Sequence, residues 1–510
     1  MLPDPDTCYR ALSARDPRFD GVFFVGVRTT RIYCRPVCPA RLPGRDRCRF
    51  FSSPGAAESA GFRPCLRCRP ERAPGRSIVD SRRGLAERAE ARIRAGGLNG
   101  RSVDELAREL HVGSRQLRRA LKRECGLPPV ALAQTYRLLL AKRLLAETEL
   151  PVSEVAFAAG FSSLRRFNAL IRDRWRLTPT QLRRRGGSGL TTGEGEGEGS
   201  VPRPAAVHPA ATVSLTLDYR PPYEWNALLD FLAVRAVPGL EIVEGRGAEA
   251  RYLRTLRVDG HRGWVSVAPS PDTPNALEAQ VSLSLLPVLM EVLDRLRSLF
   301  DLDAEPEVVD SHLTRDPKLA PLVRRRPGLR VPGAADPFEV AWRAVLGQQV
   351  SVAAARTLAG RVVAAFGSTV APAEGMPSGL SQEPVDPGAL AAATEAELVG
   401  LGLTGARARC LRALAAGVAE GTIQLSPGVD VAETTGELLQ IPGIGPWTAG
   451  YIGLRALHWP DAWPVNDLVL RRALGDPSPS ELRRSAEGWR PWRGYATLHL
   501  WNSLNDRSDP

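Results

Sequence analysis

The densest structural signal in the chain is the run Ile441-Pro442-Gly443-Ile444-Gly445-Pro446-Trp447, which lies between two stretches of helical periodicity. Two helices joined by such a turn form a helix-hairpin-helix, in which glycines let the backbone approach a phosphate and the N–H groups of the second helix attract the anion. Gly443 and Gly445 are therefore candidate contacts to a nucleic-acid backbone. The alternative, an apolar turn whose N–H groups bind nothing, is left open by the hairpin alone.

A single acidic residue follows the hairpin at a suggestive distance. Asp467 lies 22 residues after Gly445, in the segment Trp463-Pro464-Val465-Asn466-Asp467-Leu468. An isolated Asp most often caps a helix. A hairpin followed by such an Asp, however, resembles the helix-hairpin-helix superfamily of DNA glycosylases. That resemblance implies that Asp467 is the catalytic carboxylate, which would stabilise positive charge on the sugar as the base leaves.

Further stretches narrow the resemblance to the AlkA-type 3-methyladenine DNA glycosylases, over about residues 212–501. They are Pro221-Pro222-Tyr223-Glu224-Trp225, Asp301-Leu302, Arg326-Pro327-Gly328-Leu329-Arg330-Val331-Pro332-Gly333, Ala344-Val345-Leu346-Gly347-Gln348-Gln349-Val350-Ser351-Val352 and Trp492-Arg493-Gly494-Tyr495-Ala496. Carried over position by position, the resemblance places Trp447, Tyr451, Trp501 and Phe231 around the flipped base. Aromatic walls suit an alkylated, cationic base, because stacking on each is worth about 1–3 kcal/mol.

Two residues bear on the details of this expected reaction. Trp447 follows Gly445-Pro446, where lyase-competent relatives carry a Lys for a Schiff base, so we expect a monofunctional enzyme that leaves the abasic site uncut. Gln349 stands where the family has an apolar wedge that fills the gap left by the flipped base. A Gln is long enough to fill that gap and can hydrogen-bond the orphaned base.

The charge of the chain is unevenly distributed. The 510 residues carry a net charge of +12, whereas residues 1–185 hold 38 Lys and Arg against 18 Asp and Glu, a net +20. Arginines pair bidentately with phosphates and guanine edges, so a segment this basic favours nucleic acid as a partner over a merely solvated surface. No apolar run of about 18 residues occurs. The start lacks a signal peptide pattern, and we expect a cytoplasmic protein with no membrane contact.

Four of the eight cysteines form two close pairs. Cys34 and Cys38 are separated by three residues, and Cys65 and Cys68 by two. Each pair can supply two corners of a tetrahedral Zn²⁺ site, and spacing alone favours a purely structural site. The surrounding residues, from Val27 to Cys38 and from Gly61 to Cys68, resemble the Ada-type methyl-accepting zinc domain. The resemblance implies one Zn²⁺ per chain bound by these four cysteines, and Cys34 as the acceptor of a methyl group from a DNA methyl phosphotriester.

A repeated pattern follows the cysteines. Residues 102–117 recur as residues 151–166, and the region 78–185 resembles the AraC-type double helix-turn-helix domain, in which two recognition helices enter successive major grooves. The first such helix is expected to begin at Ser114, with Leu117 and Leu121 on its inner face. The exposed cations expected to contact DNA are Arg115, Arg118, Arg119 and Lys122 on this helix and Arg165 and Arg166 on the second. Amphipathic helices with solvated Arg faces remain the alternative.

These signals together predict a multidomain α+β chain. We expect a small zinc-bound α/β domain over residues 1–76, an all-α double helix-turn-helix domain over 77–185 and a flexible linker over 186–211. A small antiparallel-sheet α+β domain is expected over 212–300, with strands near Thr212–Tyr219, Leu253–Val258 and Leu277–Leu285. An all-α helix-hairpin-helix glycosylase domain is expected over 301–510.

The expected function is a bifunctional DNA alkylation repair protein and transcriptional regulator. It would accept methyl groups stoichiometrically at Cys34, with activation of DNA binding, and hydrolytically excise 3-methyladenine-type bases. Its expected partners are double-stranded DNA, at alkylated sites and promoter operators, and RNA polymerase as the activator target, and we expect a monomer. The competing hypothesis is a transcription factor only, with structural zinc and a glycosylase fold that merely binds DNA. The carboxylate of Asp467 and its aromatic neighbours argue against it.

Overall fold

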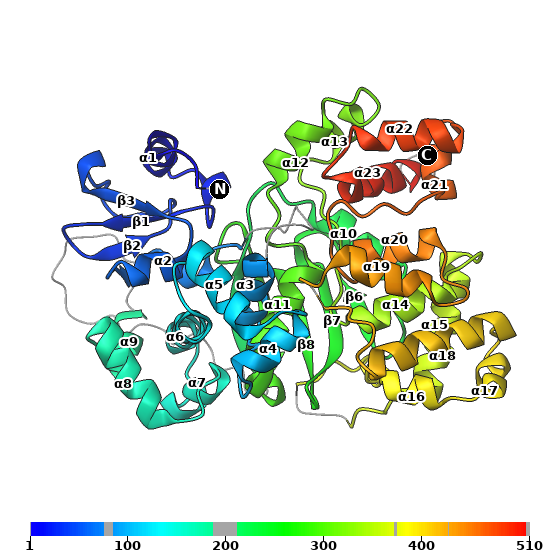
Figure 1. The fold of residues 1–510 in the computed structure, drawn as a ribbon, viewed down its shortest axis with the longest axis horizontal. Coiled ribbons are helices and arrows are strands. Elements are labelled where there is room, and N and C mark those ends of the chain that lie inside the picture. Colours follow the sequence, from blue (N-terminus) through cyan, green and yellow to red (C-terminus); the bar gives the residue numbers. More distant parts are fainter. Residues whose placement is uncertain (1, 76–84, 187–211, 372–374, 427, 506–510) are drawn as a thin grey trace. The chain divides into compact units, whose positions relative to one another are not determined.

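The computed structural model describes residues 2–75, 85–186, 212–371, 375–426 and 428–505 (Figure 1). The predicted linker over 186–211 lies, except for Gly186, outside the described residues. The chain divides into two compact units, one of residues 1–76, 84–219 and 272–294 and the other of 77–83, 220–271 and 295–510. None of the described helices is both long and apolar enough to cross a membrane.

The first unit begins with a four-stranded sheet of order β3-β1-β2-β4. Its strands are β1 (Phe24–Val27), β2 (Ile32–Cys34), β3 (Cys48–Phe51) and β4 (Arg63–Pro64), accompanied by helices α1 (Pro5–Ala14) and α2 (Pro54–Ser59). β1 pairs antiparallel with β2 and β3, whereas β2 pairs parallel with β4. Aromatic side chains such as Phe24, Tyr33, Phe51 and Phe62 fill the core on one side of this sheet. The cysteines lie in a separate cluster.

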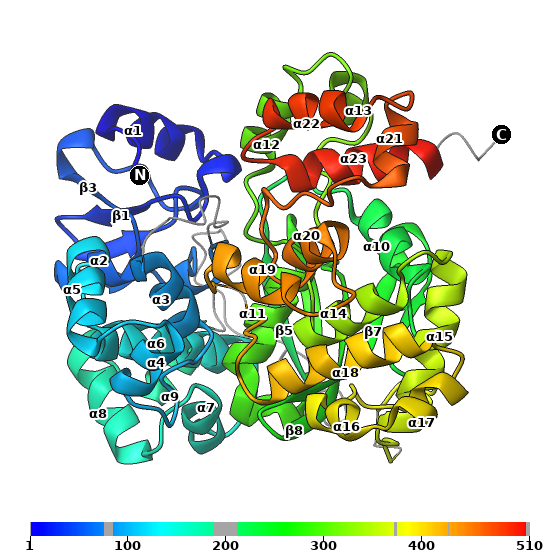
Figure 2. The ribbon, with the colours of Figure 1, turned by 45° about the vertical axis from the view of Figure 1, so that its right-hand side comes forward.

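A helical region follows in the same unit, as Figures 1 and 2 show. Its helices are α3 (Leu85–Arg94), α4 (Val103–Glu109), α5 (Ser114–Glu124), α6 (Pro129–Glu147), α7 (Val152–Ala158), α8 (Leu164–Trp175) and α9 (Pro179–Gly186). Ser102 and Glu105 form a capping box that starts α4. The 19-residue helix α6 is buried along most of its length, because it connects the two predicted helix-turn-helix repeats and packs against α3, α5, α7 and α9.

The strands of the small sheet region fall partly in the first unit and partly in the second. In the first unit β5 (Thr212–Asp218) pairs antiparallel with β9 (Ala276–Ser282). In the second, β7 (Arg251–Val258) pairs antiparallel with β6 (Glu241–Glu244) and β8 (His261–Pro269). Asp259 and Gly260, both with positive φ, make the tight turn between β7 and β8. The strand expected to reach Leu285 ends at Ser282, and residues 283–288 form a 3₁₀ turn that contains Pro287.

The rest of the second unit is helical. It contains α10 (Trp225–Ala233), the C-terminal part of α11 (Leu289–Leu299), and α12 (Pro306–Leu313), α13 (Ala320–Arg325), α14 (Pro337–Leu346), α15 (Val352–Phe366), α16 (Pro387–Ala392), α17 (Glu395–Gly400), α18 (Gly405–Ala419), α19 (Val431–Leu439), α20 (Pro446–Arg455), α21 (Leu468–Ala473), α22 (Pro479–Glu487) and α23 (Arg493–Asn505). One core of this unit joins α14, α15, α18 and α20 and includes Trp342. The predicted fold class, a multidomain α+β chain, is confirmed.

Candidate functional site

The helix-hairpin-helix predicted from the glycine-rich run consists of α19, a turn over residues 440–445, and α20. Ile441 and Ile444 are buried and fix the turn to the core, while Gly443 and Gly445 are exposed. Gly443 has φ +99°, which favours glycine, and a Cβ there would make a tight contact, 3.2 Å from the side chain of Cys410. Gly445 precedes α20 with no side-chain cap. The first N–H groups of α20 are therefore open to an anion.

Gln348 braces the same turn. Its Nε2 donates to the carbonyl oxygen of Gly443 at 2.8 Å and to Thr448 Oγ1 at 3.0 Å. The backbone carbonyl oxygen of Gln348 accepts a hydrogen bond from Arg407. The sequence places Gln348 in a matching stretch but gives no sign of this role, because the contact joins segments 95 residues apart.

Asp467 is buried, with 5% of its surface exposed, and caps the N-terminus of α21. Oδ1 accepts hydrogen bonds from the backbone N–H of Leu470 at 2.8 Å and from Nε1 of Trp501 at 3.2 Å. Oδ2 accepts one from Nε1 of Trp447 at 2.7 Å. Asp467 thus caps a helix and is also a carboxylate held between two indoles. The helix-capping role expected of an isolated Asp and a place in the candidate site are therefore compatible.

Aromatic rings continue from this carboxylate. The rings of Trp447 and Tyr451 stack with centroids 5.5 Å apart, Tyr451 and Trp501 lie 6.1 Å apart, and Phe231 stacks on Trp501 at 6.3 Å. Trp447 and Tyr451 lie one turn apart on α20, Trp501 is on α23 and Phe231 on α10. The structure thus brings together all four aromatic residues singled out in the sequence, from three helices.

These rings and Asp467 line a cavity of about 470 Å³ within the second unit. A cavity of this size is in the range that binds a small ligand. Apolar side chains of Val350, Val352 and Val469 also line it.

The sequence did not reveal two arginines, Arg235 and Arg455, that line the cavity together with the aromatic residues. The guanidinium carbon of Arg235 lies 3.7 Å from the ring centroid of Phe231, and that of Arg455 lies 4.7 Å from the same centroid. Arg455 Nη1 also donates to the hydroxyl of Tyr451 at 3.1 Å. Burial alone would raise the pKa of Tyr451, but the charges of Arg455, Arg235 and Arg343 outweigh it and lower that pKa.

Two backbone segments approach closely near Asp467. Gly450, on α20, lies against the segment that leads to the carboxylate, and a Cβ on it would be 2.3 Å from the carbonyl oxygen of Trp463. Only glycine allows this contact. The sequence shows Gly450 as one more small residue in a helix and gives no hint of this constraint.

Gln349 lies exposed in the loop between α14 and α15. Its φ of +55° is uncommon for a residue other than glycine. Its neighbours Gly347 and Val350 line the cavity. The loop that carries Gln349 therefore adjoins the cavity, although Gln349 is not one of the residues that line it.

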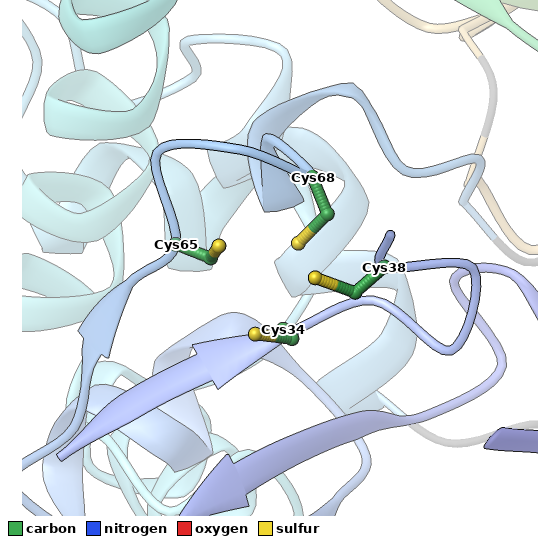
Figure 3. A group of neighbouring side chains, drawn as sticks. All are labelled: Cys34, Cys38, Cys65 and Cys68. Atoms are coloured by element: carbon green, nitrogen blue, oxygen red, sulfur yellow. The ribbon is translucent and has the colours of Figure 1, made fainter. Parts of the chain in front are cut away.

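A second site lies in the first unit, at the ends of two neighbouring strands. β2 ends at Cys34 and β4 is followed by Cys65, and the parallel register that pairs Ile32 with Arg63 brings these two cysteines together. Cys38 and Cys68 follow in short turns. Figure 3 shows the four sulfurs directed toward a common centre, and they all lie within 4.8 Å of one another.

The charges at this centre call for a cation. Hydrogen bonds with Cys38 and Cys65 raise the pKa of the Cys34 thiol. Hydrogen bonds from its neighbours, Cys34 first, lower the pKa of Cys65, and burial raises that of Cys68. Four buried sulfurs cannot all ionise side by side unless a cation offsets their repulsion, and Zn²⁺ prefers four such thiolates in a tetrahedral arrangement. The predicted zinc site is confirmed.

The sulfurs differ in their hydrogen bonds to the backbone. The N–H of Arg35 donates to Cys68 Sγ at 3.3 Å, and the N–H of Arg67 donates to Cys65 Sγ at 3.4 Å. Such bonds withdraw electron density from the accepting sulfur. Cys65 and Cys68 are thereby made poorer nucleophiles.

The cationic face predicted for the first recognition helix is present on α5. Arg115, Arg118, Arg119 and Lys122 are exposed, whereas Leu117 and Leu121 are fully buried. The N-cap is Gly113, so Ser114 is the first residue of the helix, and it makes no capping hydrogen bond.

On α8, Arg165 and Arg166 are exposed and Phe167 is buried. Here Ser163 does cap the helix, since its Oγ accepts from the N–H of Arg166 at 3.3 Å. Gly160 has φ +83° in the turn before α8, as the turn requires.

Four family models match the chain in succession. They are the metal binding domain of Ada over residues 7–71, a helix-turn-helix domain over 106–185, the AlkA N-terminal domain over 214–336, and the HhH-GPD superfamily base excision DNA repair protein over 342–488. The resemblances drawn from the sequence are confirmed.

Similar proteins cover the chain in part or nearly in full. DNA-3-methyladenine glycosylase 2 of Escherichia coli K12 is 38% identical over 56% of this chain and 96% of its own. The bifunctional transcriptional activator/DNA repair enzyme Ada of E. coli K12 is 34% identical over 31% of this chain and 42% of its own. The probable bifunctional transcriptional activator/DNA repair enzyme AlkA of Mycobacterium tuberculosis H37Rv is 41% identical over 99% of this chain and 97% of its own. The chain therefore belongs to the family of AlkA-type bifunctional transcriptional activator/DNA repair enzymes.

Proposed function

We propose that this protein repairs alkylated double-stranded DNA in two ways and regulates transcription in response. The observation that carries the proposal is the carboxylate of Asp467, buried between the indoles of Trp447 and Trp501 at an aromatic cavity. A helix-turn-helix domain or a structural zinc site has no use for such an arrangement. The cavity therefore favours an enzyme over a regulator alone.

In the glycosylase half, a damaged nucleotide flips out of the duplex and its base enters the cavity. Flipping costs on the order of a few kcal/mol, and less for a damaged pair. Trp447, Tyr451, Trp501 and Phe231 stack on the base. The carboxylate of Asp467 faces the sugar and stabilises the positive charge that develops as the N-glycosidic bond breaks and water attacks. The exposed turn with Gly443 and Gly445 holds the DNA backbone.

The residues of the cavity support hydrolysis without strand cleavage. A lyase reaction needs an amine that forms a Schiff base with the sugar. The whole sequence has three lysines, Lys122, Lys142 and Lys318, and none of them lines the cavity. The expected product is an intact abasic site, in agreement with a Trp at position 447.

Gln349 fills the space left in the duplex. It is exposed in the loop between α14 and α15, on a backbone in the left-handed region, and that loop adjoins the cavity through Gly347 and Val350. Its amide can donate to and accept from the edge of the orphaned base, which an apolar wedge cannot do.

In the N-terminal half, Cys34 Sγ attacks the methyl carbon of a methyl phosphotriester. The carbon–oxygen bond breaks, its electrons stay on the phosphate oxygen, and the products are S-methylcysteine and a phosphodiester. When bound, Zn²⁺ keeps the thiolate deprotonated and nucleophilic. The backbone hydrogen bonds to Cys65 and Cys68 direct reactivity away from those sulfurs. A thioether has no route back to the thiolate here, so the transfer is stoichiometric.

Methylation of Cys34 removes one negative charge from a surface that meets DNA phosphates. At ~4–10 Å and an effective dielectric of ~20–80, each repulsion relieved is worth roughly 0.4–4 kcal/mol. Methylated protein then binds its operator more tightly through the exposed cations of α5 and α8, and acts as an activator that recruits RNA polymerase. We further propose that the protein works as a cytoplasmic monomer. Equal operator affinities of methylated and unmethylated protein in a gel-shift titration would contradict the switch.

The glycosylase assignment is tested by release of 3-methyladenine from methylated duplex DNA. Wild type is expected to release the base and leave an abasic strand that breaks only after alkali. Asp467→Asn keeps the size of the side chain and should release none above background. Asp476→Asn, the same change at an exposed position nine residues on, is the matched control and should behave as wild type. Equal release by wild type and Asp467→Asn would refute the assignment.

A further inference from the structure

Arg35, the residue after Cys34, forms part of the wall of the cysteine centre. It is 7% exposed. Its backbone N–H donates to Cys68 Sγ, and its side-chain Nη1 donates to the carbonyl oxygen of Cys68 at 3.2 Å. Arg35 is thus joined to Cys68 by two hydrogen bonds and to Cys34 by the peptide bond between them.

Two buried carboxylates hold the guanidinium of Arg35. Asp20, in the segment before β1, accepts hydrogen bonds from Nε at 2.8 Å and from Nη2. Asp218 Oδ2 accepts one from Nη1 at 2.7 Å. Asp218 lies 183 residues away, at the end of β5, within the segment that matches the AlkA N-terminal domain.

The contact to Asp218 is one of several that join β5 to other elements of the first unit. Arg72 donates to Asp218 Oδ1 through Nη2 at 2.6 Å and through Nε at 3.1 Å. Two residues earlier on β5, the carbonyl oxygen of Thr216 accepts a hydrogen bond from Arg143 Nη2 at 2.6 Å, and the backbone N–H of Thr216 donates to Glu147 at 3.2 Å. β5 is therefore fixed by side chains of the zinc region and of α6.

Charges are balanced at this junction. The guanidiniums of Arg35 and Arg72 face the carboxylates of Asp20 and Asp218, all with little exposure to solvent. A buried ion that loses its partner is strongly destabilised. Without the charge of Asp218, the guanidiniums of Arg35 and Arg72 lose the carboxylate that they share, and nothing then holds the Arg35 side chain on this side against Cys68.

We propose that Asp218 is a positioning residue of the cysteine centre. It fixes Arg35, and through it Cys34 and Cys68, in the arrangement that binds zinc and transfers the methyl group. The second part of this inference rests on the methyl transfer proposed above. The first strand of the glycosylase-type region thereby completes the methyl acceptor, so the two repair activities share a structural element.

The test compares Asp218→Asn with Asp218→Glu in the full chain. Glu278→Gln, the same charge change on the neighbouring strand β9, is the matched control. Zinc affinity is measured by competition with a chromophoric chelator, methyl uptake at Cys34 by mass spectrometry in a single turnover, and 3-methyladenine release on the same preparations. Absorption bands of the Co²⁺-substituted protein report directly on the thiolate ligands.

Asp218→Asn is expected to weaken zinc binding and slow methyl uptake by about 10–100-fold, the usual effect of losing a residue that orients metal ligands. It should shift the Co²⁺ bands and leave base release unchanged. Asp218→Glu should recover both properties in part, and Glu278→Gln should match wild type.

Wild-type zinc affinity and Co²⁺ bands in Asp218→Asn would overturn the proposal. So would a parallel loss of base release, because that would indicate general unfolding. If wild type binds zinc but takes up no methyl group, the proposed methyl transfer fails, and the zinc competition and Co²⁺ bands alone decide the role of Asp218.

Discussion

Replacing Gly450 with alanine should impair base excision without unfolding the protein. The added Cβ would lie 2.3 Å from the carbonyl oxygen of Trp463, 2.9 Å from its carbonyl carbon and 3.0 Å from Cα of Pro464. Real Cβ atoms essentially never come within 3.0 Å of such atoms, so the backbones must separate by about 0.7 Å. One side of this contact carries Trp447 and Tyr451, and the other leads to Asp467.

A displacement of this size separates the carboxylate from the aromatic walls. A misplacement of about 1 Å costs on the order of 100-fold in rate, or about 3 kcal/mol of transition-state stabilisation. We therefore expect Gly450→Ala to release 3-methyladenine about 100-fold more slowly than wild type in single-turnover assays.

Gly453→Ala is the matched control on the same helix. Its Cβ would meet only the Cβ of Ala462 at 3.6 Å, an ordinary contact. Alanine is also the better helix former by about 1 kcal/mol, so this variant should excise normally and be slightly more stable. Methyl uptake at Cys34 by both variants checks that the N-terminal half is intact. Equal excision rates for Gly450→Ala and Gly453→Ala would refute the reasoning.

Three further predictions concern single contacts. Trp447→Phe keeps an aromatic wall but removes the 2.7 Å hydrogen bond to Asp467. Excision should slow about 10–100-fold, because hydrogen bonds to charged groups are worth about 1.5–3 kcal/mol. An unchanged single-turnover rate would show that this hydrogen bond does not contribute to catalysis. Burial raises the pKa of Glu58 from 4.5 to about 7 although Arg174 lies beside it, so the folded state binds the proton more tightly than the unfolded state does. The free energy of unfolding of wild type, relative to Glu58→Gln, should therefore fall by about 3 kcal/mol as the pH rises from 4.5 to 7. A stability difference between the two proteins that does not change with pH in denaturation experiments would contradict this. Removing zinc with a chelator should abolish methyl uptake at Cys34 and spare excision; loss of both would show that the metal supports the whole chain.

The features that could be predicted from the sequence alone are those that depend on local patterns. The four cysteines form two short-range pairs, and the hairpin is a contiguous run, so spacing was enough to place them. The aromatic residues of the cavity come from three helices, and only the family resemblance connected Phe231 with Trp501 across 270 residues. The strands β6 and β8 were missed, although Asp259-Gly260 marks the turn before β8.

Other features arise only from tertiary packing. The ion pair between Arg35 and Asp218 joins two segments that are 183 residues apart. No pattern in the sequence of either segment predicts that it contacts the other. Gly450 reads as an ordinary small residue until the carbonyl of Trp463 is seen against it. The left-handed backbone of Gln349 is likewise set by the loop around it rather than by its own preference.

Mass spectrometry of the cysteine peptides, after incubation with duplex DNA that carries methyl phosphotriesters and 3-methyladenine, tests the two proposed repair reactions most directly. We expect one added methyl group per chain, on Cys34, while the same sample continues to release 3-methyladenine over many turnovers. Methyl groups on a different cysteine, or an unmodified Cys34 after base release is complete, would contradict this expectation.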